Sequence, residues 1–290
     1  MLDSLLLPLR LGPFTPHRNS VRMNTLPPID TSVSHSARIW NYWLGGKDHY
    51  PPDREAGDQI VAVLPEIVDI AVATRAVLVR MVTHLAVEEG IDQFLDIGTG
   101  LPTANNTHEV AQTANSAARV VYVDNDPLVL AHARALLTGV SEGSTDYVHA
   151  DLRDPATILT EAAATLDLDR PVAITMFGVL PFIGEDPEAK EIIGHLMGAL
   201  PEGSFLAIVH STSAVTGEAM EEAVRRWNEA GSAVYHLRTP ERIKGLFDGL
   251  ELLEPGTVSC PLWRPGPVEI GRAREMDEFC GLARKGSQAG

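Results

Sequence analysis

The chain has 290 residues, of which 44% are hydrophobic, and a formal net charge of −16 at pH 7. That length accommodates one large α/β domain with an extension, and the composition is ordinary for a soluble globular protein. Since 39 acidic residues outnumber 23 basic ones and the basic ones form no run, attraction to a phosphate backbone is unfavourable, which argues against DNA or bulk RNA as substrate.

The two cysteines, Cys260 and Cys280, are too few for a disulfide framework and lack metal-ligand spacing. We therefore expect reduced thiols in a cytoplasmic protein and no metal site. The apolar run 5–9 is short and has neither a basic leading segment nor a small-residue cleavage site. This pattern predicts no signal peptide and no membrane span.

The N-terminal third predicts a leader and a helical segment ahead of the main domain. Residues 1–28 mix Pro, Ser, Asn, His and Thr without periodicity, which predicts a disordered leader. Residues 29–92 predict three helices, the first ending at Gly45, the second near Val63 and the third covering about 65–89. Because a helical hairpin alone would expose its apolar stripe, we expect this segment to form a lid and buttress on a sheet.

Residues 93–280 alternate strands and helices, which predicts a doubly wound, mostly parallel sheet. Strands are expected near 94–97, 119–123, 145–149, 171–177 and 203–209. Helices are expected near 104–117, 127–137, 155–165, 186–200 and 217–230, with a further short helix from Pro240 to Phe247. The runs 250–253 and 257–260 predict a closing antiparallel hairpin, and the Gly, Ser and Lys rich residues 281–290 predict a frayed tail.

The first strand leads into a glycine loop. Gly98 and Gly100 allow a tight turn after the apolar run 94–97, and Thr103 can cap the helix that follows. A strand, a glycine loop and a helix in this order form the usual place for a nucleotide-like ligand in an α/β sheet. Short Gly-x-Gly runs also occur as plain turns, so the loop alone leaves both interpretations open.

Two features of the loop disfavour a dinucleotide. A dinucleotide fingerprint needs a third glycine, and Pro102 and Thr103 stand in its place. Asp96 puts a carboxylate at the strand end, which would repel a pyrophosphate but suits a ligand with an ammonium and a sulfonium. S-adenosylmethionine is such a ligand, so it is favoured over NAD and FAD.

The next two strands also end in acids. Asp124 follows the second strand, where a carboxylate can bind both ribose hydroxyls of an adenosine, and Asn125 can add a contact. The alternative role of Asp124 as a helix cap is better met by Asp126. Asp151 and Leu152 follow the third strand, where an acid can read the adenine amino group. Acids at the ends of three neighbouring strands predict S-adenosylmethionine binding.

Four runs carry a resemblance to a known family. They are 39–48 (IWNYWLGGKD), 96–103 (DIGTGLPT), 108–112 (HEVAQ) and 122–127 (YVDNDP). Together they closely resemble a bacterial family of S-adenosylmethionine-dependent methyltransferases that was first filed as a domain of unknown function, from about Asp30 to Pro265. The resemblance implies the Rossmann-like class I methyltransferase fold and S-adenosylmethionine as cofactor, and it implies no substrate. Pro181 stands where the family usually has a histidine, which puts in doubt a base at that position.

The predicted cofactor site draws on both the sheet and the helical segment. Its members are Asp96, Gly98, Thr99, Gly100, Asp124, Asn125, Asp151, Leu152, Phe177, Arg38, Tyr42, Lys47 and Arg75. The glycine loop would lie against the methionine part of the cofactor, and Asp96 would face its ammonium or else only satisfy backbone donors. The three basic residues would meet the methionine carboxylate or an acidic substrate.

Four aromatic residues stand close together in the helical segment. They are Trp40, Tyr42, Trp43 and Tyr50. An aromatic wall attracts a sulfonium through its ring quadrupoles and excludes water. The alternative is that Trp40 and Trp43 fasten their helix to the core.

Methyl transfer from a sulfonium is an in-line displacement, which needs orientation and exclusion of water but no nucleophile or metal. A general base helps only when the acceptor is a protonated hydroxyl or amine, and His210 after the fifth strand is the candidate. We expect a small neutral or cationic acceptor in a pocket lined by Tyr42, Tyr50, Phe177 and His210, in a monomer or homodimer. A non-catalytic S-adenosylmethionine-binding sensor or scaffold is the alternative function, and a nicotinamide oxidoreductase is disfavoured.

Overall fold

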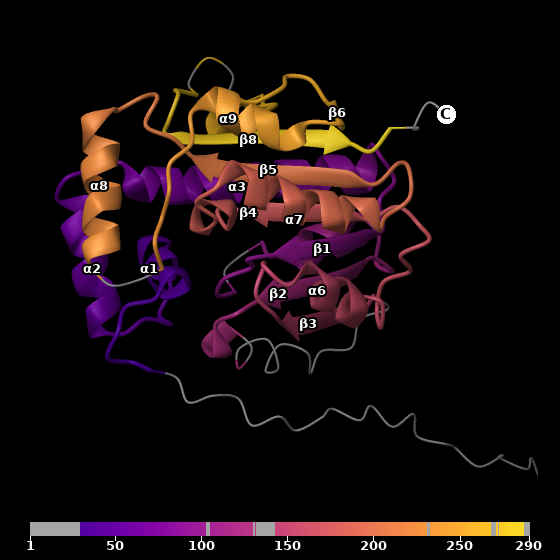
Figure 1. The fold of residues 1–290 in the computed structure, drawn as a ribbon, viewed down its shortest axis with the longest axis horizontal. Coiled ribbons are helices and arrows are strands. Elements are labelled where there is room, and N and C mark those ends of the chain that lie inside the picture. Colours follow the sequence, from indigo (N-terminus) through magenta and orange to yellow (C-terminus); the bar gives the residue numbers. More distant parts are fainter. Residues whose placement is uncertain are drawn as a thin grey trace, which may run out of the picture.

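The computed structural model describes residues 30–102, 105–129, 131, 143–230, 233–267, 271 and 273–286. The predicted leader 1–28 and the predicted cap Thr103 lie outside these residues, as does most of the predicted helix 127–137. The described elements surround one central sheet (Figure 1).

Eight strands of the described chain form this sheet, in the order β3-β2-β1-β4-β5-β8-β6, with β7 also paired to β8. They are β1 (Gln93–Ile97), β2 (Arg119–Asp124), β3 (Thr145–His149), β4 (Ala173–Phe177), β5 (Phe205–Ser211), β6 (Glu251–Leu252), β7 (Val258–Ser259) and β8 (Glu278–Arg284). Neighbours from β3 to β5 are parallel, and β5, β6 and β7 each run antiparallel to β8. The predicted class, a mostly parallel α/β sheet with an antiparallel C-terminal part, is confirmed.

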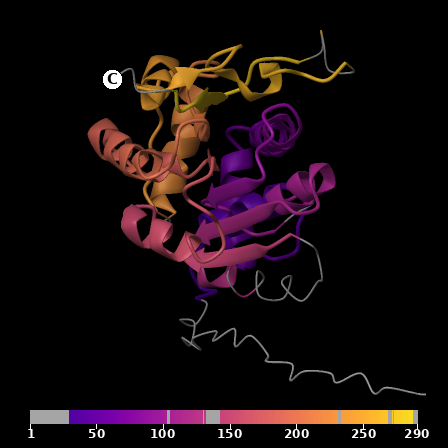
Figure 2. The same cartoon turned by 90° about the vertical axis from the view of Figure 1, so that its right-hand side faces the viewer.

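Helices cover both faces of the sheet. The α-helices are α1 (Ser36–Trp43), α2 (Pro51–Val61), α3 (Ile67–Val87), α4 (Thr107–Ala114), α6 (Pro155–Ala162), α7 (Asp186–Gly198), α8 (Glu218–Glu229) and α9 (Pro240–Lys244), and the 3-10 helices are η1 (Leu180–Phe182), η2 (Gly245–Phe247) and η3 (Cys260–Leu262). Leu95 packs in one apolar cluster with α6 and α7, while Phe94 packs in another with α3 and α4. Successive strand residues point to opposite faces, so these clusters are two separate core layers. Figure 2 shows the helices on the two sides of the sheet.

The helices α1, α2 and α8 lie beyond the carboxyl ends of the parallel strands (Figure 1). Ile39 and Trp43 of α1 pack with Ile60 of α2 and Trp227 of α8 in a third apolar cluster. The Trp43 and Trp227 rings are 6.1 Å apart at their centroids. This cluster holds the N-terminal helices over the end of the sheet at which ligands of open α/β folds bind.

The helix α3 is long and apolar enough to cross a membrane by length and composition alone. Half of the most apolar 18-residue stretch of this helix is buried inside the protein. Within the helix, Val77, Met81 and Leu85 pack against the sheet. A helix whose apolar stripe is covered in this way is a core helix.

The C-terminal end differs from the sequence prediction. The strand β8 pairs with β5 from Glu278, opposite Ser211, to Arg284, opposite Phe205, so the predicted frayed tail is wrong for residues 281–284. A Cβ at Gly281 would lie 2.9 Å from the Phe247 ring, so this glycine permits close packing and does not mark the start of a flexible tail. The predicted closing hairpin is also different, because β6 and β7 each pair with β8.

Candidate active site

A cavity of about 510 Å³ opens over the carboxyl ends of β1, β2, β3 and β4. The strand β1 has β2 on one side and β4 on the other, so the direction of winding reverses at this point. Ligands of open α/β sheets bind at such a switch point. The helices α1 and α3, the chain that follows β4 and the segment 233–236 contribute further walls.

The glycine loop after β1 forms the floor of the cavity. The Gly98 N–H donates to the Val123 carbonyl at 2.8 Å, and the Gly100 N–H donates to Asp124 Oδ2 at 2.8 Å. Both glycines have positive φ, and a Cβ at Gly98 would lie 2.5 Å from Val179 Cβ. The loop therefore needs glycine at position 98 for its conformation and for its contact with the chain after β4.

Gly98→Ala is expected to weaken S-adenosylmethionine binding by at least about tenfold, because the added Cβ must displace the loop from Val179. Gly90→Ala is the matched control: Gly90 has a similar φ of 70°, but its Cβ would meet nothing within 4 Å. Titration calorimetry and thermal unfolding of both variants separate binding from stability. Equal affinity in the two folded variants would contradict the role given to the loop.

Asp96 lies at the end of β1, buried beneath the cavity. Its Oδ2 accepts from the Thr107 hydroxyl at 2.6 Å and its Oδ1 from the Thr175 hydroxyl at 2.9 Å. Burial raises the pKa of Asp96, while these two hydrogen bonds and the charge of Arg75 oppose the rise. Each carboxylate oxygen keeps a second lone pair, so Asp96 can still accept from a ligand in the cavity.

Asp124 lines the cavity at the end of β2. Its Oδ2 accepts from the Gly100 N–H, and its Oδ1 accepts from the Asp126 N–H at 2.9 Å. Burial raises the pKa of Asp124, and the two backbone donors act in the opposite direction. Asp126 accepts from the Leu128 N–H at 2.8 Å and so fills the capping role expected of it.

The remaining sheet residues of the prediction also line the cavity. They are Thr99, Asn125, Asp151, Leu152 and Phe177. The Asn125 amide lies 3.4 Å from Asp151 Oδ2, which joins the ends of β2 and β3. Arg75 of α3 lines the cavity as well, and its guanidinium donates to the Asn105 carbonyl at 3.1 Å.

Arg38, Tyr42 and Lys47 do not line the cavity, contrary to their predicted roles. The Arg38 guanidinium is buried and donates to the carbonyls of Asp30 and Val33. The Tyr42 hydroxyl donates to Asp58 of α2 at 2.7 Å, and Lys47 is exposed beyond the end of α1. The cavity face of α1 instead carries Ala37, Trp40, Asn41 and Leu44, which follow helical spacing and leave positions 38 and 42 on another face.

His210 cannot be the predicted base. It is fully buried, its Nδ1 donates to the Ser211 carbonyl at 2.8 Å, and its Nε2 accepts from the Arg238 guanidinium at 2.6 Å. Burial lowers the pKa of His210 to about 3, and the Arg238 charge adds to this effect. The predicted acceptor pocket is likewise wrong for Tyr42 and Tyr50, and Phe177 alone of its four predicted members lines the cavity.

A model of the S-adenosyl methyltransferase family matches residues 23–286. The chain belongs to this family. A solved DUF574 family protein from Streptomyces avermitilis is 42% identical to it with a TM-score of 0.85, over 89% of this chain and 100% of that one. A candidate methyltransferase from Thermobifida fusca is 39% identical with a TM-score of 0.81, over 89% of this chain and 97% of that one. None of the curated protein sequences compared matches the chain.

Membership of the S-adenosyl methyltransferase family confirms the resemblance seen in the four sequence runs, and it makes S-adenosylmethionine the cofactor. The cavity suits this molecule on two counts. Gly98, Thr99 and Gly100 of the loop line the cavity, and glycine lets the backbone approach a ligand closely. Carboxylates of Asp96, Asp124 and Asp151 all line the cavity, where they suit the ammonium, ribose hydroxyls and adenine amino group of the cofactor.

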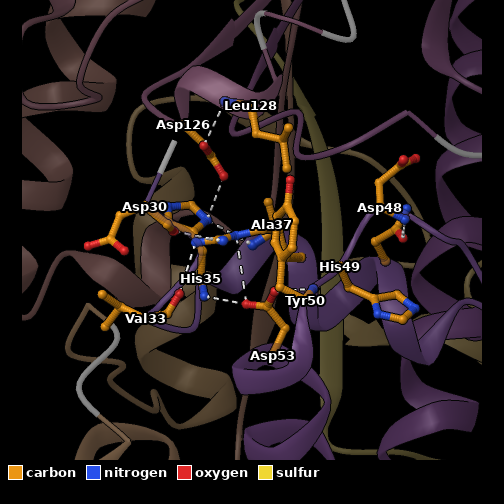
Figure 3. Close-up of polar contacts among 12 residues, drawn as sticks. Asp30, Val33, His35, Ala37, Asp48, His49, Tyr50, Asp53, Asp126 and Leu128 are labelled. Carbon is orange, nitrogen blue, oxygen red and sulfur yellow. Dashed lines mark hydrogen bonds and ion pairs between the residues drawn. The ribbon is translucent and has the colours of Figure 1, made fainter. Parts of the chain in front are cut away.

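His35 lines the cavity at the start of α1 and was not predicted. Its Nδ1 lies 3.0 Å from Asp126 Oδ2, and its backbone N–H donates to Asp53 Oδ1 at 2.8 Å (Figure 3). The Tyr50 N–H donates to the other oxygen of Asp53 at 2.7 Å. These contacts fasten the starts of α1 and α2 to the loop that follows Asp124.

Arg153 and His236 also line the cavity and were missed. Arg153 stands two residues after Asp151, so its strand-end position was a signal that could have found it. Its guanidinium donates to Glu188 Oε1 and to the Phe182 carbonyl. His236 lies between α8 and α9 in a segment without a motif, and only the tertiary fold brings it to the cavity.

Proposed function

We propose that this protein transfers the methyl group of S-adenosylmethionine to a small-molecule acceptor. The observation that carries the proposal is one cavity lined by two chemically different sets of residues. We assign the strand-end acids to a cofactor end of this cavity, and the apolar side chains of α1 and of the segment 233–236, which line the same cavity, to an acceptor end. Direct transfer between two ligands needs them oriented next to each other in one water-excluding site.

The cofactor end is assigned to residues that follow β1, β2 and β3. Asp151 and Leu152 would hold the adenine, and Asp124 and Asn125 the ribose. The loop from Gly98 to Gly100 would hold the methionine part, with Asp96 for its ammonium and Arg75 for its carboxylate. When bound, the cofactor supplies a methyl group on a positively charged sulfur.

The charge of the protein supports a small acceptor. A net charge of −16 without basic runs repels polyanions at the encounter stage, and low salt strengthens this repulsion. Nucleic acids are therefore poor candidates, and a neutral or cationic small molecule is favoured.

The test is a transfer assay with methyl-labelled S-adenosylmethionine and a fractionated cell extract. We expect label in the small-molecule fraction, accompanied by an equal amount of S-adenosylhomocysteine. Label that enters only the RNA or DNA fraction would contradict the proposal. Tight cofactor binding without turnover in any fraction would favour the alternative, a sensor or scaffold that binds S-adenosylmethionine.

A further inference from the structure

We propose that His236 is the general base of the acceptor end, and that the acceptor is an apolar aromatic molecule with an ionisable hydroxyl. This inference rests on the proposed methyl transfer and specifies its substrate class. Three groups of observations carry it: the anchoring of His236, the apolar character of the surrounding walls, and the location of the acids.

The backbone around His236 is fixed to the chain that follows β4. The His236 N–H donates to the Pro181 carbonyl at 2.8 Å. Two residues later, the buried Arg238 guanidinium donates to the carbonyls of Leu180 and Ile183. A Cβ at Gly184 would lie 2.9 Å from His236 Nε2, so the imidazole rests on the Gly184 backbone. The imidazole ring is thus held beside η1, while His236 as a whole remains exposed and lines the cavity.

The walls next to His236 are apolar and aromatic. Trp40 and Leu44 of α1 and Phe182 of η1 line the cavity and belong to the third apolar cluster. The Phe182 ring meets the Tyr235 ring edge to face, with centroids 5.2 Å apart. Val234, which is 55% exposed, adds a further apolar side chain at the cavity. Such walls suit a flat apolar ligand.

The acids that line the described cavity all follow strands of the sheet. Asp96, Asp124 and Asp151 follow β1, β2 and β3, and among the described cavity residues none from α1, η1 or 233–236 is acidic. The walls formed by α1, η1 and 233–236 therefore offer no carboxylate to a cationic amine. Two histidines line the described part of the cavity, and His35 lies against Asp126, so His236 is the imidazole assigned to the general base, the role for which imidazole is most often used.

In the proposed step the acceptor O–H bond breaks, and its proton passes to the His236 imidazole and then to solvent. The oxygen electron pair forms the new bond to the methyl carbon, and sulfur keeps the pair of the broken carbon–sulfur bond, which leaves S-adenosylhomocysteine.

The experiment uses 4-nitrophenol as the probe, because its phenolate absorbs visible light. The protein is saturated with S-adenosylhomocysteine, so that no transfer can occur, and the probe is titrated into wild type, His236→Gln and His195→Gln. His195 is an exposed histidine on α7 outside the cavity and serves as the control. We expect bound phenolate with wild type and with His195→Gln, and about tenfold weaker probe binding with loss of the phenolate signal in His236→Gln.

Binding of S-adenosylhomocysteine itself should be equal in all three proteins. An identical phenolate signal in His236→Gln overturns the role of His236, and a wild-type protein that does not bind the probe overturns the acceptor class. A protein that fails to bind S-adenosylhomocysteine overturns the proposed function together with this inference.

Discussion

Asp124→Ala is expected to weaken S-adenosylmethionine binding by about ten- to a hundredfold while the protein stays folded. A charge-assisted hydrogen bond to a ribose hydroxyl contributes about 1.5–3 kcal/mol. The substitution also removes the acceptor of the Gly100 N–H, so the loop that borders the cavity loses one of its hydrogen bonds to β2. Isothermal titration with S-adenosylmethionine measures the loss.

Two further variants make this result specific. Asp154→Ala removes the same charge from a residue that caps α6 and does not line the cavity. The affinity of this variant for S-adenosylmethionine should therefore equal that of wild type. Asp124→Asn keeps an oxygen acceptor and should lose less affinity than Asp124→Ala. Unchanged affinity in a folded Asp124→Ala protein would remove Asp124 from the site.

Glu278→Gln is expected to stabilise the protein at pH 8 by several kcal/mol. Glu278 is fully buried at the start of β8, and burial raises its pKa from 4.5 to about 8. Its Oε2 accepts from the Ser211 hydroxyl at 2.6 Å, while its Oε1 has no hydrogen-bond partner among the described residues. Glutamine can keep the serine bond and never ionises.

The direction of the pH dependence follows from the raised pKa. The folded protein retains a proton that the unfolded chain releases above about pH 4.5, so the stabilising contribution of Glu278 is complete below that pH. It is lost as the pH rises through about 8, at up to about 1.36 kcal/mol per pH unit. Wild type should therefore lose stability between pH 5 and pH 8 more steeply than Glu278→Gln.

Urea unfolding at several values of pH measures how the free energy of unfolding changes with pH in wild type and in Glu278→Gln. Glu191→Gln, at an exposed position of α7, is the control and should keep the wild-type slope. If Glu278→Gln unfolds at lower urea than wild type at pH 8, then the carboxylate is accommodated in the core and this explanation is wrong.

Much of the sheet could be predicted because β1, β2 and β4 are short, mostly apolar runs that end in, or are followed at once by, an acid or a glycine. Asp96, Asp124 and Asp151 line one cavity because the carboxyl ends of β1, β2 and β3 share one edge of the sheet. Local sequence is enough for that inference, since parallel pairing fixes the rest.

The strand β8 was missed because its sequence looks like the start of a flexible tail. Gly281 and the Gly, Ser and Lys composition around it suggest fraying, yet Gly281 is where the Phe247 ring packs against the strand. Only the tertiary contact explains that glycine. The strand β8 is also buried on both faces, so it shows no alternation of buried and exposed residues that a sequence pattern could reveal.

The helices of the N-terminal segment were predicted correctly, but the directions in which their side chains point were not predicted. Arg38 satisfies the carbonyls of the chain that enters α1, whereas His35 faces the cavity and Asp126. His210 was misassigned for a similar reason, because Arg238, distant in sequence, occupies its Nε2. Such pairings join segments that no local pattern connects.

A crystal structure of the protein with S-adenosylhomocysteine tests the central claim most directly. We predict the ligand in the cavity over β1, β2 and β3, with both ribose hydroxyls on Asp124, the adenine beside Asp151 and Leu152, and the amino-acid part on the loop from Gly98 to Gly100. A ligand bound outside this cavity, or a ribose without contact to Asp124, would contradict the account.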